Sequence, residues 1–189
     1  FTGTKVSRSS SSGACGDSAN VTGSPSPARR RIAGANPTVD TVTARADAAL
    51  LDTLVPQVDV ALDCSDNFST RQAINRACVK HRKPLVSGAA IRFDGQISVY
   101  DPRARTSPCY ACVFPESTSH EETRCATMGV FAPLVGVIGT LQAAEALKLL
   151  CGIGTSLAGR LLMLDGRGME FTEVRIGRQA NCAVCGSDH

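Results

Sequence analysis

The chain has 189 residues, of which 43% are hydrophobic and 20% are charged, and its 20 basic and 17 acidic side chains give a formal net charge of +3. This composition suits one domain with a real core and excludes global disorder, a collagen-like fibre and a disulfide miniprotein. The mild positive charge and an aromatic content of only 4% argue against nucleic-acid binding, which needs a concentrated basic face or stacking platforms.

The sequence also indicates the cellular compartment in which the protein is expected. The longest apolar run, residues 131–150, is interrupted by Pro133, Gln142, Glu145 and Lys148, so no membrane span is predicted. No stretch resembles a secretory signal, and we expect a cytoplasmic protein. Nine cysteines are many for a reducing compartment, where a disulfide framework does not persist. Some of them are therefore expected to bind metal or to carry chemistry.

The first 28 residues differ in composition from the rest. They are rich in Ser, Gly and Pro without helical or strand periodicity, which predicts a disordered or aberrant segment over residues 1–28. Because the first residue is Phe1 rather than Met, we expect a partial chain. Residues 29–189 carry the periodic patterns and are expected to form one partial domain.

In this second part, strand and helix patterns alternate, which predicts an α/β fold. In chain order we expect a strand over residues 38–44, a helix over 47–55, a buried parallel strand over 58–62, a helix over 68–81 capped by Asn67, strands over 85–91 and 96–100 joined by a turn at Asp94-Gly95, a long helix over 133–150, and closing strands over 160–165 and 169–176.

Two Cys-x-x-Cys pairs stand far apart in the sequence, Cys109 with Cys112 and Cys182 with Cys185. Each pair places two thiolates on one tight turn, and two such turns complete a tetrahedron for structural Zn²⁺. The metal would tie a mid-chain loop to the C-terminal region. The alternatives are a redox dithiol and chance. Three other cysteines lie on predicted core elements or at a helix end and are expected to be small buried hydrophobes, namely Cys64, Cys78 and Cys151.

Acidic residues follow the predicted parallel strand. Asp63 and Asp66 lie where that strand ends and the next helix begins, the edge at which nucleotides bind to open parallel sheets. A carboxylate there can hold Mg²⁺ against phosphates. The alternative is that Asp66 and Asn67 only cap the helix.

At these residues the chain resembles the MoeB/ThiF/HesA adenylyltransferases, bacterial relatives of ubiquitin-activating enzymes. Residues 62–67 (LDCSDN), followed by Arg71 and Asn75, match the family's LDCxDNxxxRxxxN stretch. Further segments match in the same order, namely residues 84–90 (PLVSGAA), 93–96 (FDGQ), 109–115 (CYACVFP), 129–136 (GVFAPLVG), 142–148 (QAAEALK) and 182–185 (CAVC). The resemblance covers residues 28–186 and implies a Rossmann-like doubly wound sheet, followed by a mixed or antiparallel C-terminal sheet.

The resemblance also implies the chemistry. In this family ATP and Mg²⁺ activate the C-terminal Gly-Gly carboxylate of a ubiquitin-like sulfur carrier of the molybdopterin or thiamine type as an acyl-adenylate. Asp66 matches the family's Mg²⁺/ATP aspartate. Cys125 matches a loop cysteine that can form a thiol-linked intermediate with the carrier, and the alternative for it is an ordinary loop thiol. A homodimer is implied as well.

One family feature is not found among the 189 residues. No predicted strand is followed by a GxGxxG loop, the element that grips the phosphates of ATP. We therefore expect a truncated Rossmann-like sheet, impaired ATP binding, and stability that depends on zinc and dimerisation. No rhodanese-like segment follows the domain, so we expect a separate sulfur donor. The competing hypothesis is a non-catalytic, zinc-stabilised module that docks a ubiquitin-like carrier.

Overall fold

The computed structural model describes residues 40–116 and 128–186. The predicted segment 1–28 and Cys125 lie outside the described residues. In chain order the elements are α2 (Ala48–Leu54), the 3-10 helix η1 (Val55–Gln57), β1 (Ala61–Asp63), α3 (Phe68–Lys80), β2 (Leu85–Ile91), β3 (Asp94–Tyr100), α4 (Tyr110–Val113), α6 (Ala132–Cys151), β4 (Arg160–Asp165) and β5 (Glu170–Arg175).

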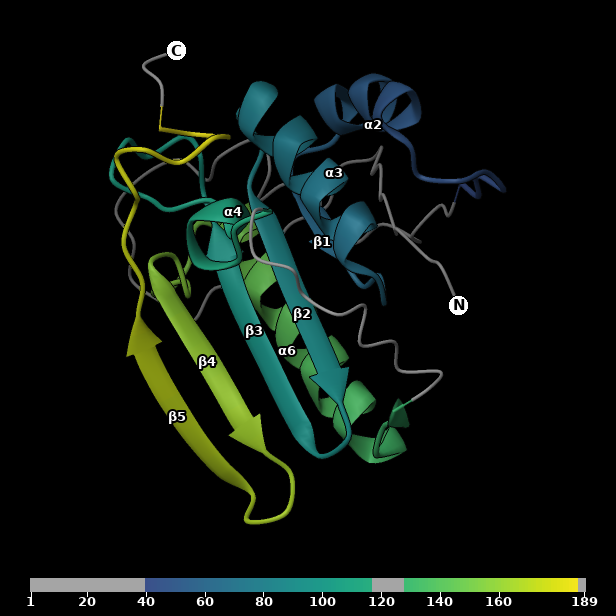
Figure 1. The fold of residues 1–189 in the computed structure, drawn as a ribbon, viewed down its shortest axis with the longest axis vertical. Helices are drawn as coiled ribbons and strands as arrows, with labels where there is room; N and C mark the ends of the chain where they lie inside the picture. The colour runs from purple at the N-terminus through teal and green to yellow at the C-terminus, as the bar shows by residue number, and fades with distance from the viewer. Residues whose placement is uncertain (1–39, 117–127, 187–189) are drawn as a thin grey trace.

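One mixed sheet organises the described part of the chain. Its five strands lie in the order β1-β2-β3-β4-β5; β1 and β2 are parallel, and every other neighbouring pair is antiparallel. The α/β prediction is confirmed. The separate C-terminal sheet that we expected is not found among the described residues. The antiparallel strands instead continue the parallel pair in one sheet, because β2 pairs with β3 along its whole length (Figure 1).

Helices cover the two faces of the sheet, as the period of two in the strands requires. On β2, Leu85 packs in a cluster with α2, α3 and α4, whereas the next residue, Val86, packs with α6. On β3, Tyr100 faces the first cluster, and Ile97 and Val99 face the second. Figure 1 shows α6 lying behind β2 and β3, with α3 and α2 beside β1.

The helix cap predicted at Asn67 is confirmed, and the other helix ends have equally clear local causes. Asp47 caps α2 by accepting from the amide of Leu50, and Asn67 caps α3 by accepting from the amide of Thr70 at 2.8 Å. The long helix ends at Gly152, which adopts the left-handed conformation with φ +63°. The apolar residues Ile74, Ala77 and Cys78 of α3 are buried.

Two local predictions were wrong. Residues 40–44 do not form a strand; they are exposed and pair with no strand in the described part of the chain. The hairpin turn lies at Arg92 and Phe93, since Ile91 pairs with Asp94, and Arg92 takes the positive φ of +50°. Asp94 and Gly95 are therefore strand residues.

Gly95 lies within β3 because α6 approaches the sheet closely there. A Cβ atom at Gly95 would lie 2.8 Å from Cδ1 of Ile138, and one at Gly88 of β2 would lie 2.5 Å from Cδ of Gln142. Both contacts are far too short for a real side chain. Two glycines on neighbouring strands thus create the space into which Ile138 and Gln142 of α6 pack.

We expect Gly88→Ala to destabilise the fold by about 1–3 kcal/mol, because the added methyl group displaces a hydrogen-bonded amide. Gly177→Ala is the matched control, since nothing lies within 4 Å of a Cβ atom at that position. Urea unfolding of both variants checks this. Equal midpoints would show that the close approach of α6 is not a real constraint.

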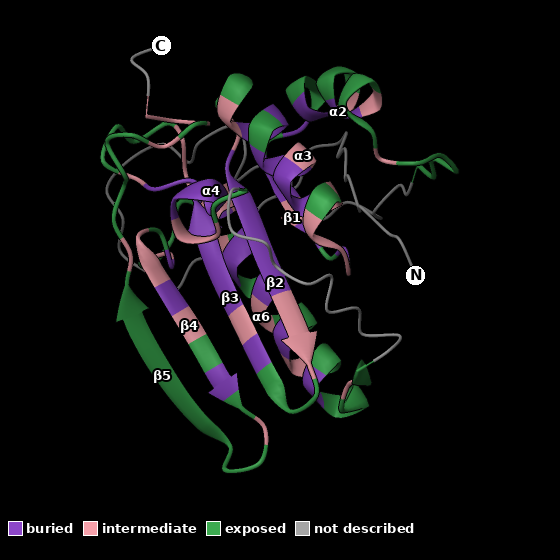
Figure 2. Cartoon of the chain, in the orientation of Figure 1, coloured by how far each residue is buried: buried purple, intermediate pink, exposed green. Residues whose placement is uncertain are grey.

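Burial differs across the sheet. In Figure 2, β2 and β3 are largely buried at their amino- and carboxyl-terminal halves respectively, whereas all residues of β5 are exposed. Among the described residues one helix, α6, is long and apolar enough to cross a membrane by length and composition alone. Its Gln142 and Glu145 are buried inside the molecule, and the helix packs on β2 and β3 as a core helix does.

Candidate functional site

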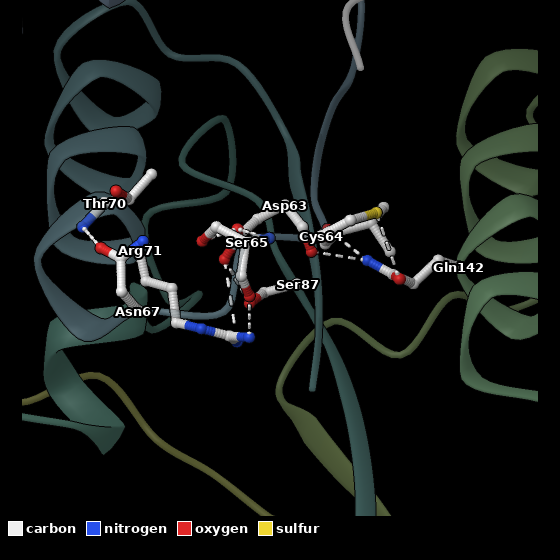
Figure 3. A network of polar contacts seen from close by, with 9 residues as sticks. Asp63, Cys64, Ser65, Asn67, Thr70, Arg71, Ser87 and Gln142 are labelled. Carbon is white, nitrogen blue, oxygen red and sulfur yellow. Dashed lines mark hydrogen bonds and ion pairs between the residues drawn. The ribbon is translucent and has the colours of Figure 1, made fainter. Parts of the chain in front are cut away.

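The carboxyl end of β1 is built around a buried carboxylate. Asp63 is fully buried, and its Oδ1 accepts hydrogen bonds from the amide and the hydroxyl of Ser65, at 2.9 and 2.7 Å. Its Oδ2 accepts from the hydroxyl of Ser87 on β2 at 3.1 Å and lies 3.8 Å from Nη1 of Arg71 (Figure 3). A buried charge needs such partners, and they fix the turn that follows the strand.

Two longer side chains brace this turn from opposite sides. Arg71 of α3 donates to the carbonyl of Ser65. From α6, Nε2 of Gln142 donates to the carbonyl of Asp63 at 2.8 Å and to that of Val86 at 3.3 Å, and its Oε1 accepts from the thiol of Cys64 (Figure 3). The strand end is thus held by one residue from each helical layer.

Asp66 lies in the turn between β1 and α3. It is partly exposed, and no described residue forms a hydrogen bond or ion pair with it. The capping role belongs to its neighbour Asn67. The two aspartates therefore differ, because both oxygens of Asp63 bind groups of the turn and its neighbours, whereas Asp66 is partly exposed at the carboxyl end of β1.

The four predicted cysteine ligands come together. Their sulfur atoms all lie within 4.8 Å of one another, although the two pairs are 73 residues apart. Cys109 and Cys112 flank the start of α4, and Cys182 and Cys185 lie on a turn closed by a bond from the amide of Gly186 to the carbonyl of Cys182. Gly186 is required there, since a Cβ atom would lie 2.4 Å from the amide nitrogen of Cys182.

The sulfur spacing fits a tetrahedral metal ion. The distances are 3.9 Å from Cys109 to Cys112, 3.7 Å from Cys109 to Cys182 and 3.4 Å from Cys112 to Cys185. Zinc–sulfur bonds of about 2.3 Å in a tetrahedron place sulfur atoms about 3.8 Å apart. The donor set and its geometry therefore match a closed four-cysteine site with no open coordination position.

Burial and the close approach of the sulfur atoms shift the pKa values of Cys109, Cys112 and Cys185. A hydrogen bond from Cys109 lowers the pKa of Cys112 to about 4, and the same bond raises the pKa of Cys109. Burial raises the pKa of Cys185 to about 11. Four sulfurs this close do not all ionise unless a cation offsets their charge, which is what a bound metal ion supplies.

The other cysteines divide differently from the prediction. Cys78 and Cys151 are buried as expected, and burial raises the pKa of Cys78 to about 12, which leaves it an inert thiol. Cys64 is exposed, contrary to the prediction, because it follows the last residue of β1 and the chain has left the sheet. Cys125 lies outside the described residues, so its catalytic role stays a prediction.

Sequence reasoning missed the partners of Asp63. Ser87 and Gln142 belong to segments that match the family, and no local pattern links them to residue 63. Arg71 and Asn75 offered a signal, since residues four apart on a helix share one face. The structure places both on the buried side of α3, where each faces a polar cluster.

Comparison with known proteins agrees with this arrangement. The ThiF family matches residues 26–184, a range that contains the braced turn and three of the four cysteine ligands. The chain belongs to the ThiF family. This confirms the relationship that the sequence motifs indicated.

Named relatives are similar over much of the chain. The adenylyltransferase and sulfurtransferase MOCS3 of Drosophila grimshawi is 50% identical over 129 residues, which are 67% of this chain and 28% of that protein. The molybdopterin-synthase adenylyltransferase of Salmonella typhimurium is 40% identical over 161 residues, which are 84% of this chain and 64% of that protein. The chain thus spans less than two thirds of either relative.

Solved structures share the fold. MccB of E. coli with MccA-N7isoASN matches with a TM-score of 0.64 and 20% identity, covering 79% of this chain and 46% of that one. MccB of E. coli with ATP matches with a TM-score of 0.60, 20% identity, and coverage of 79% and 45%. At this identity the likeness shows the fold alone.

We expect the purified chain to hold one zinc ion and Cys182→Ser to lose most of it, with a drop of several degrees in thermal midpoint, because the metal ties the C-terminal turn to α4. Cys64→Ser, the same change at an exposed thiol outside the cluster, should leave zinc content unchanged. Elemental analysis and thermal unfolding check this. A wild-type chain that holds no zinc and has the same thermal midpoint as Cys182→Ser would contradict this prediction.

Proposed function

We propose that this chain serves in the ATP-dependent adenylylation of the C-terminal Gly-Gly carboxylate of a ubiquitin-like sulfur carrier of the molybdopterin or thiamine type. The names of the two relatives, which are both adenylyltransferases, support this reaction class. The observation that carries the proposal is the position of Asp66, a carboxylate without a described partner at the edge of the sheet, inside a motif shared with the family.

In the proposed reaction a carboxylate oxygen of the carrier attacks the α-phosphorus of ATP. The new bond joins this oxygen to phosphorus, the bond from phosphorus to the bridging oxygen breaks, and pyrophosphate leaves with the electron pair. Asp66 would hold Mg²⁺, which offsets charge on the phosphate oxygens. The partners of Asp63 keep the turn rigid and so fix where Asp66 points.

The open face of the sheet supplies a docking surface for the carrier. A groove of about 530 Å³ runs over β2 to β5 and is lined by apolar and polar side chains that include Ile91, Gln96, Met163 and Thr172. It begins past Ser87, on the face of β2 that also carries that residue. We propose that the carrier packs in this groove and that its tail extends along β2 toward Asp66.

The zinc site has a structural role in this proposal. The four cysteines would hold Zn²⁺ in a closed shell, and the ion fixes the segment after β5 against α4. The reaction is proposed to be cytoplasmic. Cys125 is proposed to form the thiol-linked intermediate with the carrier.

The second candidate function is docking of the carrier without adenylylation. The 189 residues contain no GxGxxG loop, and backbone amides of such a loop provide much of the grip on nucleotide phosphates. We therefore propose that this polypeptide by itself binds ATP weakly, as part of a partial domain over residues 29–189. A module that docks the carrier without turnover is the alternative that this observation favours.

The exchange of pyrophosphate into ATP distinguishes adenylylation from docking without turnover. With a Gly-Gly-tailed carrier and Mg²⁺, we expect exchange above the carrier-free background, and a loss of roughly 100-fold in Asp66→Asn because the magnesium ligand is gone. Asp59→Asn, the same change before β1, is the control. Carrier binding by the wild-type chain without any exchange would contradict adenylylation and support the docking module.

We also propose that the outer surface of α6 mediates a homodimer. Val135 and Leu147 of this helix are about half exposed, although the helix is strongly apolar. Exposed apolar surface of this kind is typical of an interface between subunits.

Light scattering after gel filtration tests the dimer. We expect the wild-type chain to elute as a dimer and Val135→Lys to shift it toward monomer, because the lysine ammonium loses its hydration in the interface. Val42→Lys is the matched control, since Val42 is also about half exposed but lies before α2. A monomeric wild type, or identical behaviour of the two variants, would exclude this interface.

A further inference from the structure

Asn75 joins α3 to the cysteine cluster. Its side chain is buried, with 1% of the residue exposed. Its Nδ2 donates to Sγ of Cys109 at 3.7 Å, and its Oδ1 accepts from the backbone amide of Tyr110 at 2.9 Å. Both ends of one amide are therefore engaged with consecutive residues at the start of α4, and one of its partners is a cysteine sulfur of the cluster.

This contact has a chemical meaning for a metal-bound cluster. Four thiolates around one Zn²⁺ leave two excess negative charges on sulfur, and N–H groups that point at sulfur stabilise them. Such donors reach the cluster here: Nδ2 of Asn75 donates to Sγ of Cys109, and the backbone amide of Gln179 lies 3.4 Å from Sγ of Cys112. Of these two donors, only that of Asn75 belongs to a side chain and can be removed by substitution.

The alternative is that Asn75 serves only to fill space and to cap α4. The acceptor bond to Tyr110 alone would satisfy that role, and a buried NH₂ group without a good acceptor would then be costly. The amide instead directs its donor at the sulfur of Cys109. The choice of an amide, rather than a carboxylate or an apolar side chain, is explained by a negatively charged partner.

We propose that Asn75 is an outer-shell positioning residue of the metal site, which stabilises Cys109 as a thiolate ligand and slows the loss of the metal. The inference rests on the proposed zinc site. It adds a residue outside the four ligands, and it gives α3 a role in the site, since Arg71 on the same helix face holds the turn before Asp66.

Asn75→Asp removes the N–H donor. The carboxylate keeps the oxygen that accepts from Tyr110 but has no N–H group for the sulfur, and it adds a negative charge beside the cluster. Gln72→Glu is the matched control: Gln72 lies on the same helix, is 2% exposed, and donates its Nε2 to the carbonyl of Phe114 rather than to sulfur. Both variants bury one carboxylate in place of one amide.

The first readout is the rate at which a chelator in excess removes zinc from the loaded chain. We expect this rate to rise 10- to 100-fold in Asn75→Asp and to change little in Gln72→Glu. Equal rates in the two variants would overturn the proposal, because a general effect of burying a carboxylate would then account for the change.

The second readout is spectroscopic. In the cobalt-substituted chain, the thiolate-to-cobalt charge-transfer band should move to lower energy in Asn75→Asp, since a sulfur without the hydrogen bond gives up electron density more easily. A purely structural role predicts no shift. A band that coincides with those of wild type and Gln72→Glu would contradict the inference.

A measurement on the unaltered chain covers the case in which Asn75→Asp does not fold. With ¹¹³Cd in the site, one side-chain amide proton of Asn75 should show coupling to cadmium through the hydrogen bond to Cys109. Absence of this coupling in a cadmium-loaded, folded chain would overturn the proposal. A wild-type chain that binds neither zinc, cobalt nor cadmium would instead remove the proposed metal site itself, so the two failures are distinguishable.

Discussion

Four sulfur atoms that converge from two distant turns are the constraint on which this structure depends. Cys109 and Cys182 are separated by 73 residues, yet their sulfurs lie 3.7 Å apart. The segment after β5 is largely exposed and has few apolar side chains to hold it in place. A metal ion bound by all four sulfurs would replace the missing core and fix this segment beside α4.

Helix α3 relates this cluster to the candidate catalytic edge. Its buried face carries Arg71 toward the turn after β1 and Asn75 toward Cys109, one helical turn apart. The same face contributes Ile74 and Cys78 to the core, so the helix is held by packing and does not move independently of the sheet. One helix therefore contacts both the cysteine cluster and the turn that precedes Asp66.

The sequence predicted the elements with strong local signals and missed features set by distant contacts. Asn67 as a helix cap, Gly152 as a helix end and the β4–β5 pair follow from local chemistry, and the structure has them. The Asp94-Gly95 pair was assigned to a turn because it is a good turn sequence, but Gly95 is needed for contact with Ile138, 43 positions later in the chain. No local pattern contains that information.

The candidate site also combines features that the sequence predicts with features that depend on distant contacts. The spacing of the two cysteine pairs was sufficient to predict the cluster, because few structures other than a metal site need two such pairs. The separate roles of Asp63 and Asp66 were not predictable, because they depend on Ser87 and Gln142, which reach the turn from β2 and α6. Burial, rather than residue type, decides which aspartate stays available.

X-ray absorption at the zinc edge of the purified chain tests the central claim most directly. Our account predicts a first shell of four sulfur atoms at about 2.3 Å with no nitrogen or oxygen ligand. A shell that contains nitrogen or oxygen, or a chain without zinc, would contradict a closed four-cysteine site.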